Sequence, residues 1–224
     1  MSILRRWGLT GPGLSVIGFG SATPAAAAAN TPGQEAIDNL FGIVLLFAVA
    51  IVIFVQVLLV IVVFRFRKRK GHTQSVPNPI THHTGLEAAW TIVPALILLF
   101  VGIMMFQTLA VTDTIPQNPD VVVRVIGHQW FWEFVVDDGS GNVTTTVGEF
   151  TVRAGQVVKI IVESSDVAHS FYIDDFALKV DAIPGHENVY WFQAQNPGDF
   201  DVTCAEFCGQ NHRLMIGKLH VLPA

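Results

Sequence analysis

The twelve residues from Cys204 to Met215 contain both cysteines of the chain, a histidine and a methionine, in the spacing C-x3-C-x3-H-x2-M. Thiolate, imidazole and thioether groups are soft or borderline ligands, which favour copper over cations that prefer oxygen. A mononuclear blue copper site needs only one thiolate, with two histidines and a weak axial ligand, so a second cysteine is surplus to it. A disulfide or a zinc site is the alternative, but neither explains His212 and Met215 together.

A copper site built on this loop needs another histidine from a neighbouring strand. His169 is the best candidate, because residues 166–173 are rich in the β-branched and aromatic side chains that form half-buried strands. A lone histidine in a strand is more often an ordinary core or surface residue. Beside a loop that lacks one histidine, His169 is instead a predicted ligand.

Composition and two long apolar runs indicate a membrane protein. The chain has 224 residues, 51% of them hydrophobic and only 14% charged, which is too apolar for an ordinary soluble domain. Residues 40–64 and 88–111 both exceed the roughly 20 residues that cross a bilayer. Buried core helices are the alternative, but neither run has a polar face. We therefore predict a transmembrane hairpin within residues 31–112.

Charge predicts the orientation of this hairpin. Five basic residues lie within positions 65–70, and positive loops stay on the cytoplasmic side. Residues 1–112 carry seven Lys/Arg and three Asp/Glu, whereas residues 113–224 carry six and fifteen, so the exported half is acidic. Residues 1–30 have features of an export signal, including two arginines and a run of alanines, and a flexible N-terminus is the alternative.

After the second apolar run the pattern changes to short strands separated by turns, and residues 113–224 are predicted to form one all-β domain. Short strands at regular spacing are typical of a sandwich or barrel, and a metal loop before the last strand favours a cupredoxin-like Greek-key β-barrel. The predicted strands are residues 121–126, 129–136, 143–152, 157–162, 168–173, 188–194, 199–203 and 215–222.

Five motifs, in order, resemble subunit II of the haem-copper cytochrome c oxidases, of bacterial type. They are LEAAWTIVP at residues 86–94, GHQWFW at 127–132, HSF at 169–171, KVDAIPG at 179–185, and the complete cysteine loop. The resemblance covers almost the whole chain after its N-terminal region. It implies a membrane-anchored domain that holds the binuclear copper centre called CuA.

The resemblance also implies a ligand set for this centre. Both cysteine thiolates bridge two coppers, so the surplus cysteine becomes the sign of a second metal. His169 and Met215 complete one copper, and His212 with the backbone carbonyl of Glu206 completes the other. The side chain of Glu206 is expected to bind a magnesium ion at the interface with subunit I.

Three further roles follow from the resemblance. Trp130 is expected to receive electrons from cytochrome c, while Trp132 is expected to pack in the core. Asp166 resembles a carboxylate that docks the basic face of cytochrome c. Glu87, at the start of the second membrane helix, is expected at the mouth of the K proton pathway; its alternative role is to stabilise the helix dipole.

These roles together predict the subunit that delivers electrons to a respiratory terminal oxidase. Cytochrome c is the expected donor, and subunit I is the expected partner that reduces oxygen to water and pumps protons. Subunit III is expected as a further partner. The haems are expected only in the partner, because the chain has no Cys-x-x-Cys-His motif, and His82 and His83 show no ligand spacing.

Two other functions remain as alternatives. A free-standing, membrane-anchored copper carrier would not need Glu87 or the Glu206 side chain, and subunit II of a quinol oxidase would lack the copper ligands. The expected location is the bacterial inner membrane, crossed twice, with both chain ends and the copper domain on the periplasmic side.

Overall fold

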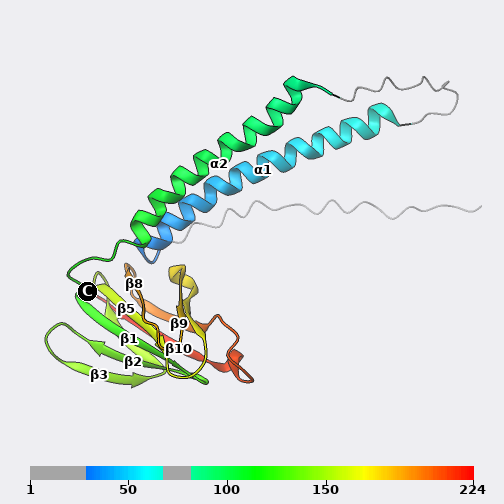
Figure 1. The fold of residues 1–224 in the computed structure, drawn as a ribbon. Coiled ribbons are helices and arrows are strands. Elements are labelled where there is room, and N and C mark those ends of the chain that lie inside the picture. Colours follow the sequence, from blue (N-terminus) through cyan, green and yellow to red (C-terminus); the bar gives the residue numbers. More distant parts are fainter. Residues whose placement is uncertain (1–28, 68–81) are drawn as a thin grey trace, which may run out of the picture.

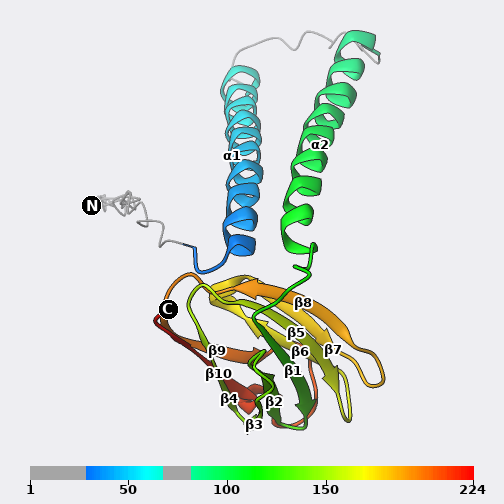
Figure 2. The ribbon, with the colours of Figure 1, turned by 90° about the vertical axis from the view of Figure 1, so that its left-hand side faces the viewer.

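Two long helices precede a β domain in the computed structural model, which describes residues 29–67 and 82–224. Helix α1 spans Pro32–Phe66 and helix α2 spans Thr84–Thr112. They run side by side, with the rings of Phe47 and Phe100 6.0 Å apart (Figures 1 and 2). The predicted export signal, apart from its last two residues, and most of the basic cluster lie outside the described residues.

Both helices are long and apolar enough to cross a membrane. Their apolar side chains have little protein cover, as shown by Phe54 at 63% exposed and Phe106 at 78%. Helix α1 begins earlier than the predicted apolar run because Thr31 caps it: the Thr31 hydroxyl accepts a hydrogen bond from the Gln34 N–H at 3.0 Å, and Pro32 follows the cap. The two predicted membrane helices are thus present, with polar extensions.

The β domain consists of two five-stranded sheets packed face to face. The first has the order β3 (Val143–Val147), β2 (Phe131–Asp137), β1 (Val121–His128), β5 (Val157–Ser164) and β8 (Asn188–Gln193). The second has the order β4 (Glu149–Arg153), β10 (Ile216–Leu222), β9 (Gly198–Cys204), β6 (His169–Ile173) and β7 (Leu178–Ala182). The β1/β5 and β4/β10 pairs are parallel and the other pairs are antiparallel. The predicted fold class is confirmed.

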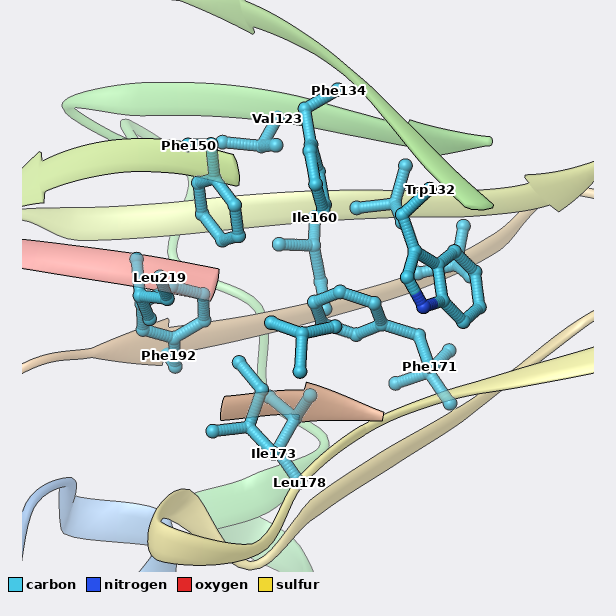
Figure 3. Close-up of a cluster of buried hydrophobic side chains, with 14 of the residues drawn as sticks. Val123, Trp132, Phe134, Phe150, Ile160, Phe171, Ile173, Leu178, Phe192 and Leu219 are labelled. Carbon is cyan, nitrogen blue, oxygen red and sulfur yellow. The ribbon is translucent and has the colours of Figure 1, made fainter. Parts of the chain in front are cut away.

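The core lies between these sheets because alternate residues of each strand point inward. Trp132 and Phe134 of β2 are fully buried and contact Phe171 of β6 (Figure 3). Phe150 of β4 lies 4.6 Å from the Phe134 ring. The aromatic residues that join the two sheets therefore also support His169, which begins the strand that carries Phe171.

Three details of the strand prediction were wrong. The predicted strand over residues 143–152 is two strands, because the chain turns at Gly148, with φ +82°, and crosses from one sheet to the other. Strand β7 was missed, although its burial alternates between apolar and charged positions. Strand β2 begins at Phe131 rather than at residue 129, so Trp130 lies in a turn before the strand and not in the strand itself.

The start of helix α1 is tied to the β domain. The backbone N–H of Gln195 donates to the carbonyl of Asn30 at 2.8 Å, and the Asn30 side chain donates to the carbonyl of Asp175 at 3.0 Å. The Thr31 hydroxyl donates to the carbonyl of Phe176 at 3.4 Å. These contacts hold the domain at the start of α1, and Figure 2 shows that the end of α2 lies next to the domain as well.

Candidate metal centre

The register of the second sheet gathers the predicted copper ligands at one end of the β domain. Strand β6 pairs with β9 so that Phe171 lies opposite Cys204, two residues from His169. Strand β9 pairs with β10, and the backbone N–H of Cys204 donates to the carbonyl of Met215 at 3.2 Å. His169, Cys204 and Met215 therefore converge, because the starts of β6 and β10 lie beside the end of β9.

The two cysteines lie at the centre of the cluster. Their sulfur atoms are 3.8 Å apart. The Cys204 sulfur lies 3.8 Å from Nδ1 of His169, and the Cys208 sulfur lies 3.5 Å from Nδ1 of His212 and 3.8 Å from the sulfur of Met215. Each cysteine thus faces the other cysteine and one imidazole, and the thioether adds a third soft donor.

The backbone carbonyl of Glu206 lies close to the cysteine pair. Its carbonyl oxygen lies 3.2 Å from the Cys204 sulfur. The residue itself is exposed, and its carboxylate makes no hydrogen bond or ion pair with any described residue. The carbonyl therefore faces the cysteines, while the carboxylate is available to a second cation.

The disulfide alternative does not agree with this geometry. A disulfide holds its sulfurs about 2.05 Å apart, whereas Cys204 and Cys208 are both buried free thiols with sulfurs 3.8 Å apart. Burial, reinforced by the neighbouring Cys204, raises the pKa of the Cys208 thiol to about 12. Ionisation of Cys208 is therefore favoured by adjacent positive charge, which bound metal ions supply.

The zinc alternative leaves one donor unexplained. His169, Cys204 and Cys208 place one ligand atom each within 4.8 Å of one another, so this group can hold a metal ion. Zinc takes four nitrogen, sulfur or carboxylate ligands and makes little use of a thioether. The buried Met215 sulfur beside Cys208 therefore favours copper.

Asp166 orients His169, a role that the sequence interpretation missed. Its Oδ1 atom lies 2.8 Å from Nε2 of the fully buried His169 ring. Burial opposes ionisation of Asp166, but hydrogen bonds from His169 and from the backbone N–H groups of Val167 and Gln129 outweigh it and lower its pKa. The carboxylate favours a proton on Nε2, which leaves Nδ1 free to bind a metal. The D-x-x-H spacing was the available signal.

Gly127 makes room for the His169 imidazole, and Trp132 packs against it. A Cβ atom on Gly127 would lie 2.9 Å from Cδ2 of His169 and 3.3 Å from the Trp132 ring. Trp132 is fully buried and meets the His169 ring edge to face, with centroids 6.0 Å apart. The predicted packing role of Trp132 is therefore confirmed, and it includes direct support of a candidate ligand.

Trp130 lies beside the cysteine loop rather than within the main core. It is half-buried in the turn before β2, and its indole ring lies close to Gly209, the residue after Cys208. The next residue, Phe131, is 40% exposed and stacks on His128 with centroids 4.6 Å apart. The Trp130 ring thus lies beside the loop of candidate ligands, and an exposed aromatic residue follows it in the chain.

Glu87 lies at the opposite end of helix α2 from the β domain (Figures 1 and 2). Its Oε1 atom is 2.9 Å from Nδ1 of His82 and accepts a hydrogen bond from the backbone N–H of His83 at 3.2 Å. An acid in the first turn also favours the helix dipole. Glu87 therefore stabilises the start of α2, and this role is independent of the predicted proton pathway.

Two family models and the relatives of the chain agree with this architecture. The model described as cytochrome C oxidase subunit II, transmembrane domain, matches residues 22–108, and the model of the periplasmic domain of the same subunit matches residues 135–220. Cytochrome c oxidase subunit 2 of Oenothera berteroana is 30% identical over 210 residues, which cover 84% of this chain and 80% of that protein. This chain belongs to the cytochrome c oxidase subunit II family. The family predicted from the motifs is confirmed, and the two helices mark the chain as a membrane protein.

The matches to other relatives cover a smaller share of those proteins. Cytochrome c oxidase subunit 2 of Zea mays is 31% identical over 166 residues, which cover 64% of each protein. The subunit 2 of the bacterium Alkalihalophilus pseudofirmus is 33% identical over 163 residues, which cover 69% of this chain and 46% of that protein. This chain thus spans about two thirds or less of the length of these two relatives. The periplasmic-domain match includes every predicted copper ligand, from His169 to Met215.

Proposed function

We propose that this chain accepts single electrons at a binuclear copper centre and passes them to a haem-copper oxidase partner. One observation carries the proposal: two buried free cysteines face each other at 3.8 Å, and two imidazoles, a thioether and a carbonyl lie 3.2–3.8 Å from their sulfurs. One blue copper would leave part of this donor set unused. Two bridged coppers use all of it.

The residues fit a binuclear copper centre in a specific way. Cys204 and Cys208 would bridge the metals, His169 and Met215 would complete one copper, and His212 with the Glu206 carbonyl would complete the other. If two coppers shared one unpaired electron, the charge change per metal on reduction would be halved, so electron transfer would require little ligand movement. The strands and the Asp166 hydrogen bond supply the rigidity that such a site requires.

The proposed electron donor is cytochrome c, and Trp130 is the proposed point of contact. Fifteen of the eighteen acidic residues follow residue 112, which gives this domain the charge that attracts a basic protein. Asp166, whose side chain is 32% exposed, is the individual carboxylate proposed for docking. Its hydrogen bonds to His169 and Gln129 mean that replacing it would also disturb the metal centre.

The remaining groups are proposed to face the partner subunits. The exposed Glu206 carboxylate would bind magnesium shared with subunit I, which, together with subunit III, would complete the oxidase. Glu87 would lie at the mouth of the K proton pathway. The proposed location is the bacterial inner membrane, with the β domain in the periplasm, because Arg65 and Arg67 follow the first span on the side opposite this domain.

Purification in a mild detergent, followed by metal analysis and electron paramagnetic resonance, tests this function. The expected result is two coppers that share one unpaired spin, in a complex with a haem-containing partner. A blue centre with one copper would refute the binuclear assignment. A two-copper protein that purifies without any haem protein would support the free-standing carrier, and the presence of all copper ligands already disfavours a quinol oxidase subunit.

A further inference from the structure

A direct hydrogen bond joins the turn that carries Trp130 to the cysteine loop. Nε2 of Gln129 donates to the backbone carbonyl of Cys208 at 2.7 Å. The backbone N–H of the same Gln129 donates to Oδ2 of Asp166, also at 2.7 Å. Gln129 is therefore held by a bridging cysteine on one side and by the partner of His169 on the other.

Gly209 brings the indole ring close to the same backbone. Its φ of +120° suits glycine, and a Cβ atom there would lie 3.0 Å from Nε2 of Gln129. The same Cβ atom would lie 3.4 Å from both Cζ2 and Nε1 of Trp130. The indole edge thus packs against the residue next to Cys208, with no side chain between them.

No polar contact of its own fixes the Trp130 ring. Its Nε1 atom is enclosed and has no hydrogen-bond partner among the described residues, although a buried indole N–H usually finds one. The ring position therefore depends on packing and on the backbone of the preceding residue. Asp166 holds the backbone N–H of Gln129, and the Gln129 side-chain amide ties the same residue to the Cys208 carbonyl.

We propose that Gln129 is a positioning residue, whose amide holds Trp130 against the cysteine loop and so sets the rate of electron transfer into the metal centre. This inference rests on the proposed function. One electron leaves reduced cytochrome c, which becomes oxidised, and one electron reduces the centre; no bond forms or breaks and no proton moves. Gln129 acts through Trp130 and does not itself bind metal.

The test compares Gln129→Leu with Gln193→Leu in the full chain. Leucine is similar in size to glutamine but has no donor. Gln193 is a matched control, because its Nε2 also donates to a backbone carbonyl, that of Gly155 at 2.8 Å. Gln193 pairs with Val157 at the start of β5, whereas the turn that carries Asp166 follows the end of β5 at Ser164. Gln129→Glu, which also removes the donor, serves as a second variant if Gln129→Leu does not fold.

The first measurement reports the ring position without any electron transfer. Fluorine NMR of 5-fluorotryptophan-labelled protein gives a resonance for Trp130, which the Trp130→Phe variant assigns. We expect this resonance to shift or broaden in Gln129→Leu and to stay unchanged in Gln193→Leu. A Trp130 resonance that is native in both Gln129 variants overturns the proposal.

The second measurement uses the copper-loaded complex and reduced cytochrome c in stopped flow. We expect the limiting rate in Gln129→Leu to fall by on the order of tenfold, the scale seen when supporting hydrogen bonds are lost. Copper content, the paramagnetic resonance signal and the half-saturating cytochrome c concentration should stay native. A raised half-saturating concentration with a native limiting rate would instead assign Gln129 to docking and overturn the proposal.

The two measurements separate this inference from the proposed function. If wild-type protein binds no copper pair or accepts no electrons, the proposed function fails, and the rate-setting role of Gln129 fails with it. The fluorine resonance would then still report whether Gln129 positions Trp130. If wild-type protein transfers electrons and both Gln129 variants do so at the native limiting rate, only the inference fails.

Discussion

Replacing Gly127 with alanine tests whether the space beside His169 is essential to the metal centre. The new methyl group would lie 2.9 Å from Cδ2 and 3.2 Å from Cγ of His169. Carbon atoms normally pack about 3.5–4.0 Å apart, so the imidazole would have to move by roughly 0.6–1.1 Å. It cannot move freely, because Asp166 holds Nε2 at 2.8 Å and the ring is fully buried.

The expected loss follows from this displacement. Changes in groups that orient a metal-binding histidine typically weaken metal affinity by about 10–100-fold. By the same scale, Gly127→Ala should lose copper to a chelator at a concentration about 10–100-fold lower than the wild type requires. Its paramagnetic resonance signal should also change, because one imidazole is displaced. Thermal unfolding in the presence of chelator gives the stability of the fold separately.

Gly198→Ala is the matched control for this experiment. Gly198 also lies in a strand, but a Cβ atom there would meet only the Phe200 ring, at ordinary distances of 3.4 and 3.5 Å. We expect copper retention in this variant to equal that of the wild type. If Gly127→Ala retains both coppers with a native spectrum and native resistance to the chelator, the argument that Gly127 makes room for His169 is wrong.

Three further variants test the metal centre, the outer face of the second sheet, and the core. Cys208→Ser should lose the shared-spin signal of two coppers, measured by electron paramagnetic resonance. Hydrogen bonds to Asp199 and then to Glu149 raise the pKa of His220. The ion pairs of His220 therefore stabilise the fold fully below about pH 6.5, and this stabilisation is lost as the pH rises through the pKa of His220 in the folded protein. In thermal melts across this range, His220→Gln should remove that part of the pH dependence. Phe134→Ala should lower the free energy of unfolding of the β domain by about 3–5 kcal/mol, measured with denaturant.

Each of these outcomes can fail in a distinct way. A native two-copper signal in Cys208→Ser would exclude a bridging role. An unchanged pH dependence in His220→Gln would show that the two ion pairs, which lie near the surface, are screened by solvent. For Phe134→Ala, the control is Val189→Ala at a 40% exposed site of β8, where the change should be within about 0.5 kcal/mol; equal losses at both sites would contradict the assignment of the core.

Local sequence patterns were sufficient for the elements whose burial is simple. Both membrane helices were predictable because a bilayer demands a long apolar run, and most strands were predictable from alternation. Strand β7 was missed because its two charged residues conceal three buried apolar ones. The division at Gly148 was missed because the residues on both sides favour strands, and only pairing with different sheets separates them.

The sequence by itself determined the identity of the donors in the cysteine loop, since their chemistry and spacing are local properties. It also indicated that His169 completes the set. Only the tertiary structure decided how the donors meet, because strand register brings His169 to Cys204 and closes the loop on Met215. The roles of Gly127 and Gln129 likewise depend on contacts between distant segments, which no spacing in the chain encodes, whereas Asp166 contacts a histidine only three residues away.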